Sequence, residues 1–138
     1  MSVGNFVVDN SVVMTWCFRN EENEYSLKVL SMLEKSLAYV PAVWPLEAGN
    51  VLAVAERRGR INKSDSSYIL ELLLSLPIIV EQESVRRMLS EIFMLARDYG
   101  ISTYDASYLD LAMKMSLPLA TLDEKLKKAA KACKVKLV

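Results

Sequence analysis

The sequence contains no histidine, and its two cysteines, Cys17 and Cys133, lie far apart in the chain. The lack of histidine excludes Ser-His-Asp and Cys-His nucleophilic catalysis and most zinc sites. Two cysteines without a paired spacing do not form a disulfide framework, so we expect reduced thiols. Any hydrolytic chemistry in this chain must therefore use other side chains.

Long hydrophobic runs are also absent. No apolar stretch approaches the ~20 residues that a membrane-spanning helix requires, and residues 1–5 lack the basic region of a signal peptide. We therefore expect a cytoplasmic protein that does not associate with membranes. The formal net charge is zero, so the chain as a whole lacks the basic surface of a typical nucleic-acid-binding protein. Binding of RNA would require a local basic patch or a metal ion.

The composition favours one globular domain that spans residues 1–138. Hydrophobic residues make up 52% of the chain and charged residues 25%, which is enough to form a full core. Short apolar runs alternate with segments of helical periodicity, a pattern that predicts a parallel sheet covered by helices on both faces. The expected fold is therefore a three-layer α/β/α domain with roughly five strands. The strands are expected at residues 6–8, 38–40, 77–80, 118–122 and 135–138, and the helices at 12–18, 25–37, 44–58, 66–76, 85–99, 103–116 and 125–132.

Four carboxylates follow the ends of predicted strands or lie in the first turn of the next helix. They are Asp9, Glu47, Asp105 and Asp123. Ligand sites in open α/β sheets form outside the carboxyl ends of the strands, so these acids can meet at one edge. Four acids without a basic partner would repel one another, and hard divalent cations such as magnesium prefer oxygen ligands. One or two such ions could orient a water molecule and stabilise the charge that develops on a phosphodiester.

Each acid also has a simpler interpretation. Asp123 can be a helix N-cap, which stabilises a helix by about 1 kcal/mol. Asp105 and Glu47 can interact with the positive ends of their helices, an effect of roughly 0.3 to 1 kcal/mol. Asp9 is harder to explain by packing because it directly follows a buried apolar strand. The sequence leaves both interpretations open.

Four segments closely resemble the PIN-domain family and occur in the family's order. They are VVDNS at 7–11, PLEAGNVL at 45–52, STYDASYLDLA at 102–112 and LPLATLDEKL at 117–126. The chain is similar in particular to the VapC-type toxins of bacterial and archaeal toxin–antitoxin pairs. The resemblance implies a PIN-like fold with a five-stranded parallel sheet and an endoribonuclease activity that depends on Mg²⁺ or Mn²⁺.

The resemblance also implies the site and the partners. The metal-binding and catalytic acids would be Asp9, Glu47, Asp105 and Asp123, and Ser11 and Thr121 match hydroxyl positions beside them. The implied partners are an RNA substrate, a cognate antitoxin protein and a second copy in a homodimer. The alternative is a non-catalytic PIN-like domain that only binds other proteins.

Three further features concern the surface of the chain. The leucine-rich helices at 25–37 and 66–76 predict an apolar groove for an antitoxin helix, because not all of their apolar side chains fit one core. The lysines at 125, 127, 128, 131, 134 and 136 are the solvated face of a terminal helix or a surface that holds RNA phosphates. Asp110 lies about 140° from Asp105 around its helix, and we expect it to be a solvated or capping group.

Overall fold

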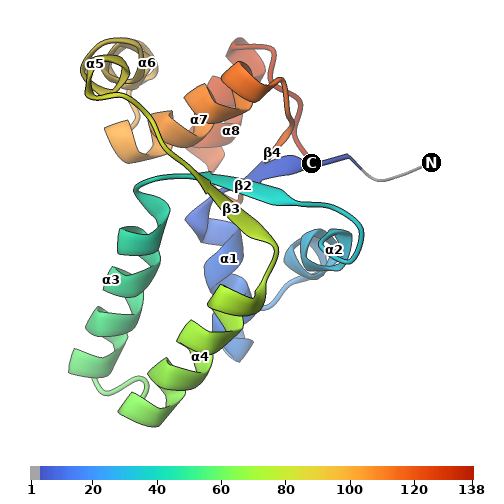
Figure 1. Cartoon of the computed structure of the whole chain (residues 1–138), viewed down its shortest axis with the longest axis vertical. Helices are drawn as coiled ribbons and strands as arrows, with labels where there is room; N and C mark the ends of the chain where they lie inside the picture. Colours follow the sequence, from blue (N-terminus) through green and yellow to red (C-terminus); the bar gives the residue numbers. More distant parts are fainter. Residues whose placement is uncertain (1–3) are drawn as a thin grey trace.

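The computed structural model describes residues 4–138, and a four-stranded parallel sheet lies at its centre (Figure 1). The strands are β1 (Phe6–Val8), β2 (Ala38–Pro41), β3 (Ile78–Glu81) and β4 (Leu119–Ala120), in the order β3-β2-β1-β4. Strand β1 is fully buried and is paired on both sides, with β2 and with β4. This confirms the predicted α/β class with a parallel sheet.

The predicted fifth strand at 135–138 is reduced to a single bridge between Leu119 and Leu137. The Leu119 N–H donates to the Lys136 carbonyl at 2.9 Å, and the Val138 N–H donates to the Leu119 carbonyl at 3.0 Å. Because β4 contains only two residues, it offers no longer ladder to a neighbour. Within residues 4–138 the sheet therefore has four strands instead of the roughly five expected.

Helices cover both faces of the sheet and produce the predicted three layers (Figure 1). On one face lie α1 (Asn10–Cys17), α2 (Glu24–Met32), α3 (Trp44–Arg57) and α4 (Lys63–Ser75). On the other lie α5 (Val85–Arg87), α6 (Phe93–Tyr99), α7 (Thr103–Met115) and α8 (Glu124–Ala132). A 3₁₀ turn at Arg19–Glu21 and a π-helical segment at Met88–Ile92 complete the chain's helical elements in this range.

The helix ends follow from local sequence signals. The Asn23 and Asn62 side chains cap α2 and α4, each within a reciprocal capping box. Helix α6 ends at Gly100, which adopts the left-handed conformation that glycine tolerates best. Helix α2 is shorter than predicted and stops at Met32 instead of residue 37.

The helix predicted at 85–99 is not one regular α-helix, because the π-helical segment separates α5 from α6. The Ser90 hydroxyl donates a 2.6 Å hydrogen bond to the Arg86 carbonyl, four residues earlier. A serine that bonds back to this carbonyl competes with the backbone ladder and bends helices, which explains the irregular turn.

Both cysteines are free, as expected. Among residues 4–138, none of the helices combines the length and the apolar character needed to cross a membrane.

Candidate active site

Asp9 occupies the position directly after β1 and caps the N-terminus of α1. Only 3% of its surface is exposed. Its Oδ1 accepts hydrogen bonds from the Ser11 N–H at 3.1 Å and the Ser11 hydroxyl at 2.5 Å, while its Oδ2 accepts from the Thr121 hydroxyl at 2.7 Å. The carboxylate is therefore held in one orientation by two elements of the fold.

Thr121 and Ser11 also join the ends of β1 and β4. The Thr121 hydroxyl accepts from the Asp123 N–H at 3.0 Å, and the Ser11 hydroxyl accepts from the Leu122 N–H at 3.0 Å. Asp123 then caps α8, because its Oδ1 accepts from the Leu126 N–H at 2.9 Å. These bonds place Asp9 and Asp123 at the same edge of the sheet.

Glu47 lies in the first turn of α3, after the end of β2. Its Oε1 accepts a 2.6 Å hydrogen bond from the hydroxyl of Tyr108 on α7. Tyr108 is buried, with 1% of its surface exposed, and sequence reasoning missed it as a site residue. The signal that could have found it is its spacing of three residues from Asp105, which puts both side chains on neighbouring parts of one helix face.

Asp105 is the electrostatic centre of the four acids. It lies in the first turn of α7, where its N–H donates to the Ser102 hydroxyl at 3.0 Å. The negative charge of Asp105 contributes to raising the pKa of both Asp9 and Glu47, and the charge of Asp123 contributes to raising the pKa of Asp105. The structure thus places Asp105 within electrostatic reach of each of the other three predicted acids.

Burial is the main cause of the raised pKa values. It moves the pKa of Asp9 from 3.8 to about 6, although the hydrogen bonds from Ser11 and Thr121 oppose the shift. Burial also raises the pKa of Glu47 against the opposing hydrogen bond from Tyr108. The pKa of Asp105 is raised by burial first and by Asp123 second.

No cation of the described protein neutralises these acids. None of the ion pairs among residues 4–138 includes Asp9, Glu47, Asp105 or Asp123. In the same range, no three acids are arranged closely enough to hold one metal ion together. Magnesium usually takes only one or two carboxylates and keeps several waters. An all-oxygen set of acids with no protein cation matches that preference, so the donor groups fit a hard divalent cation.

The capping interpretation is correct for the geometry of Asp123, and it applies to Asp9 as well. A cap leaves acceptor capacity, because each carboxylate oxygen has two lone pairs. Oδ2 of Asp9 accepts from the Thr121 hydroxyl. A capping role and a ligand role are therefore compatible in the same side chain.

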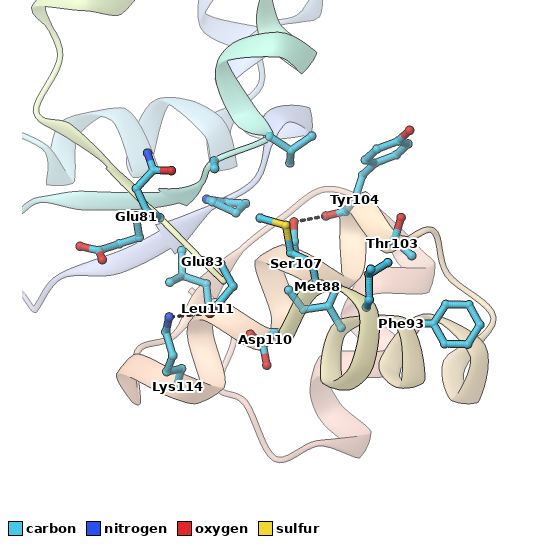
Figure 2. Close-up of a pocket in the computed structure, with 16 residues that line it drawn as sticks. Glu81, Glu83, Met88, Phe93, Thr103, Tyr104, Ser107, Asp110, Leu111 and Lys114 are labelled. Atoms are coloured by element: carbon cyan, nitrogen blue, oxygen red, sulfur yellow. Dashed lines mark hydrogen bonds and ion pairs between the residues drawn. The ribbon is translucent and has the colours of Figure 1, made fainter. Parts of the chain in front are cut away.

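The prediction that Asp110 is solvated or capping is wrong. Its side chain is only 9% exposed and forms an ion pair with Arg87 at 2.6 Å. Arg87 also contacts Glu83 at 3.2 Å, and Glu83 pairs with Lys114 at 2.8 Å, the pair drawn in Figure 2. Asp110 was misread because Arg87 lies 23 residues away in the sequence. The network connects α7 to α5 and lies apart from the four site acids.

Comparison with known proteins identifies the family of this chain. The sequence profile of the PIN domain matches residues 6–132, so the chain belongs to the PIN domain family. It is 30% identical over 120 residues to "Ribonuclease VapC3" of Pyrobaculum aerophilum, a match that covers 87% of this chain and 90% of that protein.

Solved structures share the fold. The crystal structure of PAE2754 from Pyrobaculum aerophilum has a TM-score of 0.68 and 26% identity, covering 92% of this chain and 87% of that one. VapBC2 from Rickettsia felis, solved with a DNA fragment from the promoter, has a TM-score of 0.68 and 13% identity, covering 97% of each chain. FitAcB from Neisseria gonorrhoeae has a TM-score of 0.64 and 22% identity, covering 96% and 95%. At these last two identities the likeness concerns the fold alone.

Proposed function

We propose that this chain is a metal-dependent endoribonuclease and the toxin of a toxin–antitoxin pair, as its similarity to the ribonuclease VapC3 suggests. The observation that carries the proposal is the buried Asp9 carboxylate, fixed by Ser11 and Thr121 beside three further acids. Burying a carboxylate beside other acids destabilises the fold, and strongly perturbed acids of this kind cluster at functional sites.

One or two of the four acids would hold Mg²⁺ or Mn²⁺ directly, and the ion would supply positive charge for the phosphodiester in the transition state and activate water. Ser11 and Thr121 keep Asp9 oriented, and Tyr108 does the same for Glu47. An acid of the site that does not contact the metal would take up the proton of the attacking water.

The direct test is cleavage of RNA by the purified chain. We expect cleavage with magnesium or manganese, none with chelator, and none for Asp9→Asn with either metal. Asp98→Asn, which changes an exposed aspartate on α6, is the matched control and should cleave like the unchanged protein. Cleavage that persists in chelator would show a contaminating nuclease or a different mechanism.

The rival function is a non-catalytic interaction domain of the same fold. Isothermal titration with manganese separates the two, because an intact site binds the metal. Loss of binding in Asp9→Asn, with binding kept in Asp98→Asn, would locate the metal at the acidic edge. Absence of manganese binding in the unchanged protein would favour the rival.

We also propose that an antitoxin helix occupies a groove between α2 and the end of α4. The groove has a volume of about 410 Å³, and its lining includes Leu27, Leu30, Leu33 and Leu76. Leu74, near the end of α4, is 87% exposed. Exposed apolar surface of this kind is typical of interaction sites. Leu27→Asp should abolish copurification with the coexpressed antitoxin and leave RNA cleavage intact, whereas unchanged copurification would exclude this groove.

A second apolar surface suits a homodimer. It surrounds a pocket of about 270 Å³ at the α5–α7 side (Figure 2), and Leu89, Phe93 and Tyr104 are exposed there, with Leu89 at 75%. We expect light scattering to show a dimer and Leu89→Lys to shift it toward monomer. A monomer at every concentration would exclude the dimer.

A further inference from the structure

The C-terminal segment concentrates the positive charge of the chain. Residues 124–138 contain six lysines and one acid, Glu124, although the whole chain has zero formal net charge. Lys127 pairs with Glu124 at 3.2 Å. Within residues 4–138 none of the ion pairs involves the other five lysines of this segment, namely Lys125, Lys128, Lys131, Lys134 and Lys136, and all five are exposed.

The lysines of α8 lie on one side of the helix. Lys127, Lys128 and Lys131 have the spacing of a single helical face, and Lys125 flanks it. The opposite side is anchored in the core by three buried residues, Leu126, Ala129 and Ala130. The helix therefore presents its ammonium groups outward on a fixed support.

This lysine face is continuous with the acidic site. Asp123 is both the fourth site acid and the N-cap of α8. It is joined to Asp9 through the Thr121 hydroxyl, which accepts from the Asp123 N–H and donates to Asp9. The lysines begin within the first turn after the site and extend about 9 Å along the helix from Lys125 to Lys131, given 1.5 Å for each residue.

A polyanion that reaches this site meets repulsion from the acids and no general attraction from a chain without net charge. The attraction must come from a local surface. A second group of cations, Arg57, Arg58 and Arg60, lies at the C-terminal end of α3, whereas Glu47 lies in its first turn. Arg60 is also paired with Glu21 at 3.3 Å. Of the two groups, the α8 lysines alone lie next to the site.

We propose that the lysine face of α8, formed by Lys125, Lys127, Lys128 and Lys131, binds the phosphate backbone of single-stranded RNA as the strand leaves the acidic site. The inference rests on the proposed function for the identity of its ligand. The face provides charge without base-reading groups, so it contributes affinity and direction and no sequence preference.

The test compares two variants of equal net charge. The first is Lys125→Gln/Lys128→Gln/Lys131→Gln. The control is Lys28→Gln/Lys35→Gln/Lys63→Gln, which changes three exposed lysines on or near α2 and α4. Binding of a labelled uridine oligomer of about 12 nucleotides, a length within the usual single-strand site size, is followed by fluorescence anisotropy in chelator at several salt concentrations.

Each phosphate contact contributes about 0.7 to the slope of log K against log salt for single strands. We expect the α8 variant to lower this slope by about 2 and to bind roughly 50-fold more weakly at about 0.15 M salt. The control should bind within about twofold of the unchanged protein, since net charge alone has a weak effect at this ionic strength. Equal losses in both variants, or none in either, would overturn the proposal.

Two further measurements separate the alternatives. Flotation with phosphatidylcholine vesicles that contain phosphatidylserine tests an anionic membrane as ligand. Loss of vesicle binding with unchanged RNA binding in the α8 variant would overturn the proposal in favour of a lipid surface.

RNA binding that depends on α8 without any cleavage in manganese would refute the nuclease function and keep this surface. Normal cleavage with RNA binding unaffected by the α8 changes would refute this surface alone. If the triple variant does not fold, Lys131→Gln decides, with an expected loss of about fourfold.

Discussion

The hydroxyl of Tyr108 on α7 donates a 2.6 Å hydrogen bond to Oε1 of Glu47 on α3. This bond joins helices from opposite faces of the sheet at the acidic edge, and it opposes the rise in the pKa of Glu47 that burial causes. The buried environment and the carboxylate in turn raise the pKa of Tyr108, so the phenol stays protonated as a donor.

Tyr108→Phe should therefore slow RNA cleavage while the chain still folds. A hydrogen bond to a charged group contributes about 1.5–3 kcal/mol, which corresponds to a loss of roughly 10- to 100-fold in rate if the bond persists in the transition state. The measurement is kcat/KM in manganese, with Tyr68→Phe as control, because Tyr68 is exposed on α4. A rate equal to that of the control would show that Tyr108 only fills the core.

The Thr121 hydroxyl is predicted to be essential and its methyl group dispensable. Thr121→Val removes the donor to Asp9 and the acceptor for the Asp123 N–H, whereas Thr121→Ser keeps both. We expect the valine variant to lose cleavage and to move the pKa of Asp9 above about 6, since the Thr121 bond lowers it. Cleavage rates test the loss of activity in both variants, and the pH dependence of urea unfolding in chelator reports the pKa of Asp9. A valine variant with the unchanged profile would contradict the role of Thr121.

Stability should fall as pH rises through the range where Asp9 titrates. Its folded pKa is about 6 against 3.8 for the free side chain, so the native state holds more protons than the unfolded state between these values. In chelator, the contribution of Asp9 alone should lower the free energy of unfolding by about 2 kcal/mol from pH 4 to pH 7. Urea unfolding at several pH values measures the drop, which should largely disappear in Asp9→Asn and persist in Asp98→Asn.

The Arg87–Asp110 pair should be a strong contributor to stability. Arg87→Ala leaves the Asp110 carboxylate nearly buried without its partner at 2.6 Å, and an unsatisfied group of this kind costs about 1–3 kcal/mol. The double variant Arg87→Ala/Asp110→Asn should recover part of this loss. Arg86→Ala, at the exposed neighbouring position, is the control in urea unfolding. A loss no greater than that of the control would place the pair among ordinary surface contacts.

Much of the fold could be predicted because its signals are local. The run Phe6-Val7-Val8 is apolar and ends at an acid, and β1 occupies these three residues with Asp9 as the following cap. The edge that collects the four acids follows from the same pattern, since parallel strands end at one side of the sheet. Sequence reasoning therefore placed the acids at this edge, and the PIN resemblance pointed to Ser11 and Thr121 beside them; the role of these residues in a site stays a prediction.

What could not be predicted depends on contacts between distant residues. Tyr108 and Glu47 are 61 positions apart, and Arg87 and Asp110 are 23 apart. Helical spacing shows which side chains share a face of one helix. It does not show which side chain of a second helix will contact that face. The fifth strand was overestimated for a similar reason, because only the length of β4 decides how many residues a neighbour can pair with.

The last prediction concerns Asp105. Its charge contributes to raising the pKa of Asp9 and Glu47, and the charge of Asp123 contributes to raising the pKa of Asp105. If these acids oppose the fold, Asp105→Asn removes the repulsion that all three share and keeps nearly the same shape. We expect this variant to lose RNA cleavage and to melt above the unchanged protein in chelator near neutral pH. For a domain of this size, each kcal/mol of relieved repulsion raises the melting temperature by about 3–5 °C.

Manganese should reduce the difference in melting temperature between Asp105→Asn and the unchanged protein. A ligand that binds only the folded state stabilises it by RT ln(1 + [L]/Kd), which is about 2.7 kcal/mol at a hundredfold excess over Kd. Asp105→Asn should gain less from the metal than the unchanged protein. Asp98→Asn, at an exposed position on α6, should gain as much as the unchanged protein. Thermal melts of the three proteins with and without manganese are the measurement. A variant that melts lower in chelator and gains the full metal effect would show that Asp105 acts only on the positive end of α7.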